Sequence, residues 1–322
     1  FIWKSDDPNN ADYGVVLGYK KNVDNYTILR FPSRCTKVAN EWNIYNNDDV
    51  DEAARIKRSN TSNILKVELP DTVKELGRAA FGTGDYGAFD FSSLERVELS
   101  KNISKIENYT FVNCKNLKYV KMPDSITEIG ESAFSGCENL NIQIPDNITE
   151  IGSYAFFGCK ALESITIPDG VKKIGDSSFS GCTNIQQINL PEGLETIDSW
   201  AFFACKNLQK INLPEGLKKI GGVCFEYCTS LQQINLPEGL ESIGSSAFDS
   251  TNNLSEIIIP ESVKTIGEYA FDDWTEKQTI KCKATKAGDN WDKYWNYNYA
   301  YTASNATKIS ANIIWGYQDN NT

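Results

Sequence analysis

Leu190-Pro-Glu-Gly-Leu194 returns as Leu213-Pro-Glu-Gly-Leu217 and as Leu236-Pro-Glu-Gly-Leu240, at a constant step of 23 residues. An isoleucine and a phenylalanine follow each copy at fixed distances, and a cysteine follows the first two copies. A fixed period of about 20 to 50 residues is typical of a solenoid, in which each repeat buries its apolar face against its neighbours. The period therefore predicts a stack of coils around one hydrophobic core.

Nine coils are expected between Ile64 and Lys277. Stacking like residues on like residues also predicts a ladder of phenylalanines through the core. The residues that end the strands are Pro70, Ser100, Pro123, Pro145, Pro168, Pro191, Pro214, Pro237 and Pro260. The phenylalanine ladder consists of Phe81, Phe111, Phe134, Phe156, Phe179, Phe202, Phe225, Phe248 and Phe271.

Two kinds of spacing alternate within a coil. Gln187-Ile-Asn-Leu190 alternates polar and apolar residues, as a strand with one buried face does, and Pro191 ends it because proline cannot donate a backbone N–H. The following segment changes to helical spacing, since Ala201 and Phe202 lie four and three residues before Cys205. We expect an α/β stack with a parallel sheet on the concave face and short helical turns on the convex face.

Two places depart from this regularity. Residues Gly82–Phe91 contain an insertion that should bulge from the outer side of the first coil. The coil that ends at Pro145 is one residue short after Leu140, so a local kink or bulge is expected there.

The chain is expected to form one continuous unit with an N-terminal cap over residues 1–63, a solenoid over residues 64–277, and an aromatic-rich C-terminal cap over residues 278–322. Such caps cover the apolar side chains that the last coils would otherwise expose. The runs Tyr13–Tyr19 and Tyr26–Pro32 predict a hairpin in the first cap.

Two further expectations concern the ends of the chain. The acidic start of Asp48–Arg58 predicts a short helix, because acids are favoured in a first helical turn. In the tail, Trp291 and Trp295 are compatible with a closing cap or with an exposed platform that binds sugars.

Residues Ile144–Leu162 read Ile-Pro-Asp-Asn-Ile-Thr-Glu-Ile-Gly-Ser-Tyr-Ala-Phe-Phe-Gly-Cys-Lys-Ala-Leu. This pattern, repeated over residues 64–276, resembles the BspA-like leucine-rich repeat family. The resemblance implies a right-handed coil and a secreted or surface-displayed protein of a host-associated microbe, often an adhesin for host proteins or other cells. No catalytic residues come with the resemblance. Departures from the pattern are Ser100, Asp198, Thr251 and Trp274.

The composition excludes several classes of function. The 322 residues include no histidine, which removes Ser-His and Cys-His nucleophile activation and most zinc sites. The net charge of −11 argues against nucleic-acid binding, because nucleic-acid-binding proteins carry basic patches. No apolar run is long enough to insert into a membrane. We expect no enzyme activity, no cofactor and no metal.

Nine cysteines are present, and six of them recur at one apolar position of the coil. We interpret these six as buried free thiols, because free cysteine is among the most buried residue types. A disulfide between Cys224 and Cys228 remains an open alternative. The recurring six are Cys114, Cys137, Cys159, Cys182, Cys205 and Cys228.

The concave sheet face is the candidate ligand face. Its middle part is uncharged apart from one lysine, and its amides can both donate and accept hydrogen bonds. The alternative is that these residues are ordinary polar strand residues that bond only to one another. The candidate residues are Asn141, Gln143, Ser164, Thr166, Gln187, Asn189, Lys210, Asn212, Gln233 and Asn235.

The sequence therefore predicts a non-enzymatic, secreted or cell-surface interaction protein that is adhesin-like. Its partner would be a protein or glycan on a host or neighbouring cell. Two alternatives are a carbohydrate-binding module built on the C-terminal aromatic region and a passive surface spacer.

Overall fold

The computed structural model describes residues 2–3, 9, 15–18, 28–38, 63–83, 91–297, 307–309 and 311–318. In these residues it contains 23 β-strands and no helix, and so no helix with the length and apolarity to cross a membrane. The chain forms two compact units, residues 1–161 (unit 1) and residues 162–322 (unit 2). The expected helix at Asp48–Arg58 and the inserted residues 84–90 lie outside the described residues.

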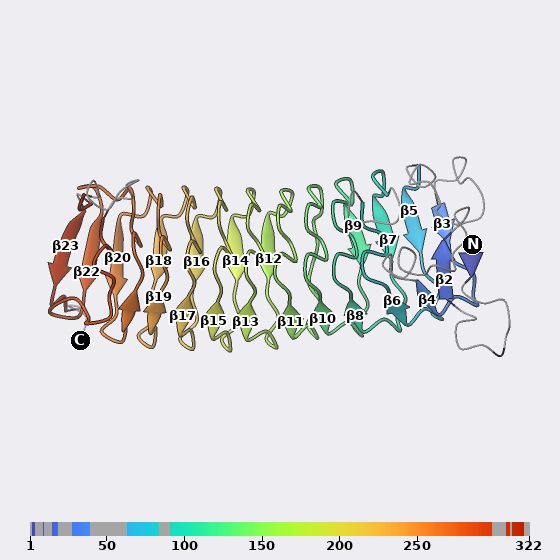
Figure 1. The fold of residues 1–322 in the computed structure, drawn as a ribbon, viewed down its shortest axis with the longest axis horizontal. Helices are drawn as coiled ribbons and strands as arrows, with labels where there is room; N and C mark the ends of the chain where they lie inside the picture. Colours follow the sequence, from blue (N-terminus) through green and yellow to red (C-terminus); the bar gives the residue numbers. More distant parts are fainter. Residues whose placement is uncertain are drawn as a thin grey trace, which may run out of the picture. The chain divides into compact units, whose positions relative to one another are not determined.

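Unit 1 contains two layers of strands (Figure 1). One layer is a parallel sheet of β3 (Ile28–Arg30), β5 (Lys66–Glu68), β7 (Arg96–Glu98) and β9 (Tyr119–Lys121). The other layer begins with β1 (Ile2–Trp3), β2 (Val15–Gly18), β4 (Lys37–Val38) and β6 (Glu75–Leu76). It continues with β8 (Lys105–Ile106), β10 (Glu128–Ile129) and β11 (Glu150–Ile151), which pair in parallel.

The hairpin expected near the N-terminus is wrong. Strand β2 pairs antiparallel with β1 and parallel with β4, whereas β3 pairs in parallel with β5. The reason is the pattern of β3, in which Leu29 is buried between exposed Ile28 and Arg30. This is the alternation of a repeat strand, so β3 joins the repeat sheet and leaves β2 to the other layer.

Unit 2 repeats the two layers with closer regularity (Figure 1). One layer contains β12 (Ser164–Thr166), β14 (Gln187–Asn189), β16 (Lys210–Asn212) and β18 (Gln233–Asn235), followed by a second sheet of β20 (Glu256–Ile259), β22 (Thr279–Cys282) and β23 (Asn312–Trp315). The other layer contains β13 (Lys173–Ile174), β15 (Thr196–Ile197), β17 (Lys219–Ile220), β19 (Ser242–Ile243) and β21 (Thr265–Ile266). Neighbours pair in parallel, and Ile188, Ile211 and Ile234 lie in register.

Hydrogen-bonded turns replace the short helical turns that the sequence predicted. Ser132 N donates to Ser153 O of the next coil at 2.9 Å, and Phe134 N donates to Ala155 O at 2.8 Å. These N–H groups cannot also serve the carbonyls four residues back, as a helix requires. In addition, Tyr154 has a φ of 57°, which interrupts any run of right-handed helical residues.

The phenylalanine ladder is confirmed in both units. Every ring of the ladder is fully buried, and the measured neighbours have ring centroids 5.2 to 5.8 Å apart. This is offset stacking, a favoured arrangement for aromatic rings. The fold is thus a parallel-sheet solenoid of about eight turns, so the predicted number of nine coils is not confirmed.

Candidate binding face

The outward side of β12, β14, β16 and β18 forms what we call the amide face of unit 2. In each strand the middle residue is buried and its two neighbours are exposed, because side chains alternate across a strand. Eight of the ten candidate residues lie here in register. They are Ser164, Thr166, Gln187, Asn189, Lys210, Asn212, Gln233 and Asn235.

The first half of the amide face is occupied by its own hydrogen bonds. Gln187 Nε2 donates to Asn189 Oδ1 at 2.9 Å, and Asn189 Nδ2 donates to Thr166 Oγ1 at 3.1 Å. These side chains behave as the simpler interpretation expects, since their polar groups satisfy one another. A ligand here would have to replace existing bonds.

The second half is different. Within the described part of the chain, the side chains of Asn212, Gln233 and Asn235 make no hydrogen bond, and Lys210 has no ion-pair partner. All four are exposed. Their donors and acceptors face solvent and are available to a ligand.

A groove of about 650 Å³ lies over this second half. Lys210, Gln233 and Asn235 line it together with Gln209 and Gln232, which also carry exposed amides. Sequence reasoning missed these last two, because they lie one residue before the strands and outside the alternating pattern. With Gln233 and Asn235 they form a cluster of four amides beside Lys210.

The rim of the groove carries paired charges. Lys283 Nζ lies 2.6 Å from Glu238 Oε1, and Lys281 Nζ lies 2.8 Å from Glu256 Oε2. The hydrogen bond that Lys281 donates to Glu256 is the largest cause that raises the pKa of Lys281. Within each pair the lysine and the glutamate neutralise each other. Lys210 is therefore the charged group of the groove that remains available to a ligand.

Asn141 and Gln143 are exposed but do not belong to a strand, which corrects their place in the candidate face. Their coil is the one shortened by a residue, and the expected irregularity takes the form of a missing strand between β9 and β12. The loss of one residue breaks the register that a ladder needs. These two amides therefore lie in unit 1, outside the amide face.

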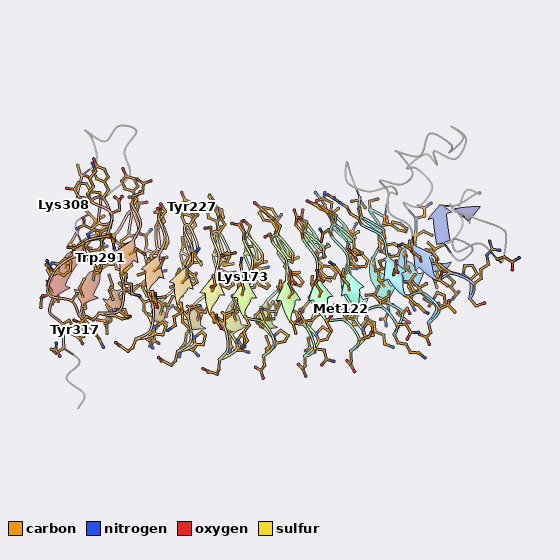
Figure 2. The ribbon with its side chains drawn as sticks, turned by 60° about the horizontal axis from the view of Figure 1, so that its bottom comes forward. Met122, Lys173, Tyr227, Trp291, Lys308 and Tyr317 are labelled. Atoms are coloured by element: carbon orange, nitrogen blue, oxygen red, sulfur yellow. The ribbon has the colours of Figure 1, made fainter. Side chains whose placement is uncertain are left out.

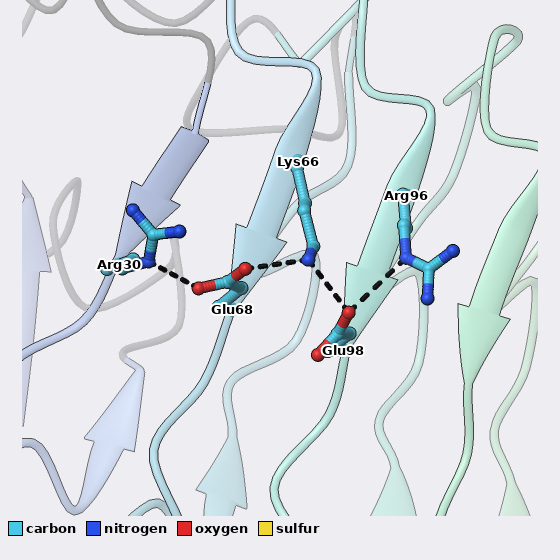
Figure 3. Close-up of polar contacts among 5 residues, drawn as sticks. All are labelled: Arg30, Lys66, Glu68, Arg96 and Glu98. Atoms are coloured by element: carbon cyan, nitrogen blue, oxygen red, sulfur yellow. Dashed lines mark hydrogen bonds and ion pairs between the residues drawn. The ribbon is translucent and has the colours of Figure 1, made fainter.

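The corresponding face of unit 1 is charged (Figure 3). Lys66 Nζ lies 2.6 Å from Glu68 Oε1 and 2.8 Å from Glu98 Oε1, and Arg30 and Arg96 pair with the same two carboxylates. The hydrogen bonds from Lys66 are the largest cause that lowers the pKa values of Glu68 and Glu98. In this network three cations share two carboxylates, so each of these charges has a partner. Lys121 on β9 is exposed and forms no ion pair among the described residues, but no carboxylate network surrounds it.

Comparison with known proteins identifies the family of the repeat. A family model described as "BspA type Leucine rich repeat region (6 copies)" matches residues 83–166 and 149–278, more than half of the chain. The chain belongs to this family. No curated protein matches it significantly.

Solved structures similar to this BspA-type chain share its fold. A leucine-rich repeat protein from Bacteroides ovatus is 23% identical with a TM-score of 0.67, and the match covers 84% of this chain and 66% of that one, just under two thirds. A leucine rich cell surface protein from Faecalibacterium prausnitzii is 22% identical with a TM-score of 0.51, covering 88% and 74%. The pneumococcal vaccine antigen PcpA is 20% identical with a TM-score of 0.52, covering 87% and 78%.

The cysteines of the BspA-type repeat are buried and unbonded. All nine are free thiols, including Cys224 and Cys228, so the alternative of a disulfide between these two is not supported. Five of the ladder thiols donate to the phenylalanine carbonyl of the preceding coil, and Trp274 makes the same bond to Phe248 O from the cysteine position. Burial raises the pKa of Cys228 to about 12. The thiol bonds are Cys114–Phe81, Cys137–Phe111, Cys159–Phe134, Cys205–Phe179 and Cys228–Phe202, at 3.0 to 3.3 Å.

The C-terminal indoles pack as a cap would. Trp291 and Trp295 are only 8% and 5% exposed, and Trp295 packs edge-on against Phe271 at the end of the ladder. Trp291 Nε1 donates to Val263 O at 3.2 Å. A sugar-binding platform made of Trp291 and Trp295 requires both indoles to be exposed. The structure contradicts this hypothesis because both are buried.

Proposed function

We propose that this chain is a non-enzymatic interaction protein that binds a protein or glycan of a host or neighbouring cell through the amide face of unit 2. We further propose that it acts as a secreted or surface-displayed, adhesin-like module. Membership of the BspA-type family supports an interaction role. The similar protein from Faecalibacterium prausnitzii is described as a cell surface protein, which supports this location.

The observation that carries the proposal is the contrast within the amide face. Lys210, Asn212, Gln233 and Asn235 present unused donors and acceptors, three of them in a groove of about 650 Å³. Amides can bond to peptide groups or to sugar hydroxyls, and an ammonium can bond to a carboxylate or sulfate. The groove therefore suits an extended polar chain that carries an occasional negative charge.

A binding screen tests this proposal. The intact chain is presented to host matrix proteins, host glycans and bacterial surfaces, and the affinity for the strongest binder is measured by calorimetry. The double variant Gln233→Ala/Asn235→Ala should weaken that binding by about tenfold or more, since each lost hydrogen bond contributes about 1 kcal/mol. Lys210→Ala should weaken it further for an acidic ligand.

The matched control is Asn141→Ala/Gln143→Ala, which removes the same two residue types from the coil without a strand. This control should leave affinity within about twofold of the original chain, because it lies outside the groove. Equal losses in both double variants would contradict a site on the amide face. If the intact chain binds no member of the panel, the binding role is rejected and a passive spacer is favoured.

A further inference from the structure

A second exposed surface of unit 2 lies on its turn segments, away from the strands. Trp200 and Tyr227 are each 43% exposed, and Phe203 lies between them with ring centroids 5.0 Å and 5.7 Å away. Figure 2 shows Tyr227 at the rim formed by the turns, apart from the strand that carries Lys173. We call Trp200, Phe203 and Tyr227 the aromatic patch. Exposed, contiguous aromatic groups are characteristic of interaction surfaces.

Two residues of the aromatic patch have a backbone conformation that is uncommon for large side chains. Trp200 has a φ of 62° and Tyr227 a φ of 58°, a region that bulky side chains disfavour. The same two positions have a positive φ in the other coils of unit 2, where they carry small residues such as Ser177 and Gly181 but also Val223 and Tyr269. The stacking of coils therefore accounts for the positive φ, while the residue type at these positions varies from coil to coil.

Carboxylates continue the same surface. Phe203, Glu226, Asp249 and Asp272 occupy one position in successive coils, 23 residues apart. The backbone bonds from Tyr227 N to Asp249 O at 3.2 Å and from Ser250 N to Asp272 O at 3.1 Å hold these coils in register. Acidic groups are thus stacked directly beside the aromatic patch.

Glu226 and Asp249 are neighbouring carboxylates of this column. Among the described residues, no lysine or arginine forms an ion pair with Glu226 or Asp249. Partial burial, followed by the neighbouring carboxylates, raises the pKa of Glu226 to about 7. Partial burial raises the pKa of Asp249 to about 6. Elsewhere the chain places a lysine beside a glutamate, as between Lys264 and Glu241 at 2.8 Å.

We propose that the aromatic patch, with Glu226 and Asp249 beside it, is a second binding surface of unit 2 and that it takes a lysine- or arginine-rich segment of a partner protein. A guanidinium or ammonium group is attracted to the faces of Trp and Tyr rings and forms charge-assisted bonds with carboxylates. Such a segment would supply the missing positive charge and cover the exposed rings. Arginine suits this surface better than lysine because its planar group also stacks on aromatic rings.

The test uses labelled nona-arginine and nona-lysine with the intact chain, followed by fluorescence anisotropy at two salt concentrations. Nona-arginine should bind more tightly than nona-lysine. Trp200→Asn and the double variant Glu226→Gln/Asp249→Asn should each weaken nona-arginine binding by about fivefold to tenfold. Asparagine tolerates positive φ, so the first variant removes the indole without adding strain.

Two controls separate this surface from general attraction to an acidic protein. Tyr154→Asn removes an aromatic group that is 41% exposed, has a φ of 57° and contacts Phe157, but has no acidic residue at the corresponding positions of the following coil. At pH 8, where Glu226 and Asp249 are mostly ionised, Glu192→Gln/Glu215→Gln changes the net charge as the acidic double variant does, at exposed positions elsewhere. Both controls should change affinity by less than about twofold.

Equal weakening by the test variants and their controls would overturn the proposal in favour of non-specific charge attraction. Phe203→Ser provides a second aromatic variant, because Ser180 fills the same position in a neighbouring coil, and unchanged affinity in both aromatic variants would also overturn the proposal. Gln233→Ala/Asn235→Ala should leave nona-arginine binding unchanged. The proposal for the aromatic patch can therefore fail or succeed independently of the proposal for the amide face.

Discussion

The strand faces of the two units share the same backbone arrangement but carry different side chains. In unit 1 the side chains of β3, β5 and β7 form a network in which each carboxylate is paired, as Figure 3 shows for Glu68 and Glu98. In unit 2 the outward side chains of β16 and β18 are three amides and one lysine, and they have no such partners among the described residues. The comparison shows that the repeat determines where polar groups point, while the residues in each coil determine whether those groups remain free to bind.

The comparison rests on the two units having the same core. We therefore expect Phe134→Ala in unit 1 and Phe225→Ala in unit 2 each to cost about 3–5 kcal/mol of unfolding free energy, because each removes a fully buried ring from the stack. Denaturant unfolding followed by circular dichroism measures this cost. Phe157→Ser, at a ring that is 41% exposed, is the control and should cost less than about 0.5 kcal/mol. A small cost in only one unit would show that the cores differ.

Glu226 of unit 2 and Glu98 of unit 1 should respond to pH in opposite directions. The pKa of Glu226 is raised to about 7, so its protonated form favours the folded state. Glu226 therefore destabilises the fold progressively as pH rises from about 4.5 to about 7, and its effect is absent below that range. Because the side chain is partly exposed, we expect Glu226→Gln to raise stability by only about 1 kcal/mol at pH 8.

Thermal unfolding at pH 4 and pH 8 measures this effect. The variant Glu192→Gln, at an exposed position, is the control and should show no such difference between the two pH values. An equal gain from Glu226→Gln at both pH values would contradict the explanation by burial and charge repulsion. It would indicate instead that the amide simply packs better than the carboxylic acid.

The repeat made the regular parts of the molecule predictable. The phenylalanine ladder and the outward positions of Gln187 to Asn235 follow from a constant step, because stacking superimposes residues that are 23 apart. The turn segments were predicted wrongly as helical. A spacing of three and four residues cannot distinguish a helix from turns whose remaining N–H groups bond to the next coil, as Phe134 N does.

The aromatic patch was not predicted, although its residues were visible. Trp200 and Tyr227 occupy positions where the repeat accepts many residue types, and their neighbourhood exists only after coils are stacked. Writing the coils one above another would have placed Phe203, Glu226 and Asp249 in one column. Whether Lys210 is paired could not be read in the same way, because pairing depends on where long side chains extend.

The smallest expected effect tests the charged network of unit 1. The hydrogen bond from Lys66 is the largest cause that lowers the pKa of Glu98, so the ionised carboxylate favours the folded state. Its contribution is present above the unfolded pKa near 4.5 and is lost as pH falls below that value. Glu98→Gln should cost about 0.2–1 kcal/mol at pH 7 and little at pH 3, since the pair is exposed to solvent. Raising the salt concentration should reduce the cost.

Glu95→Gln is the matched control for Glu98→Gln. Its carboxylate lies 3.0 Å from Lys118 in a single exposed pair, so its loss should cost less than that of Glu98, which contacts both Lys66 and Arg96. If the two variants cost the same, the network would add nothing beyond isolated pairs. The strand face of unit 1 would then differ from the amide face of unit 2 in charge but not in how firmly its side chains are held.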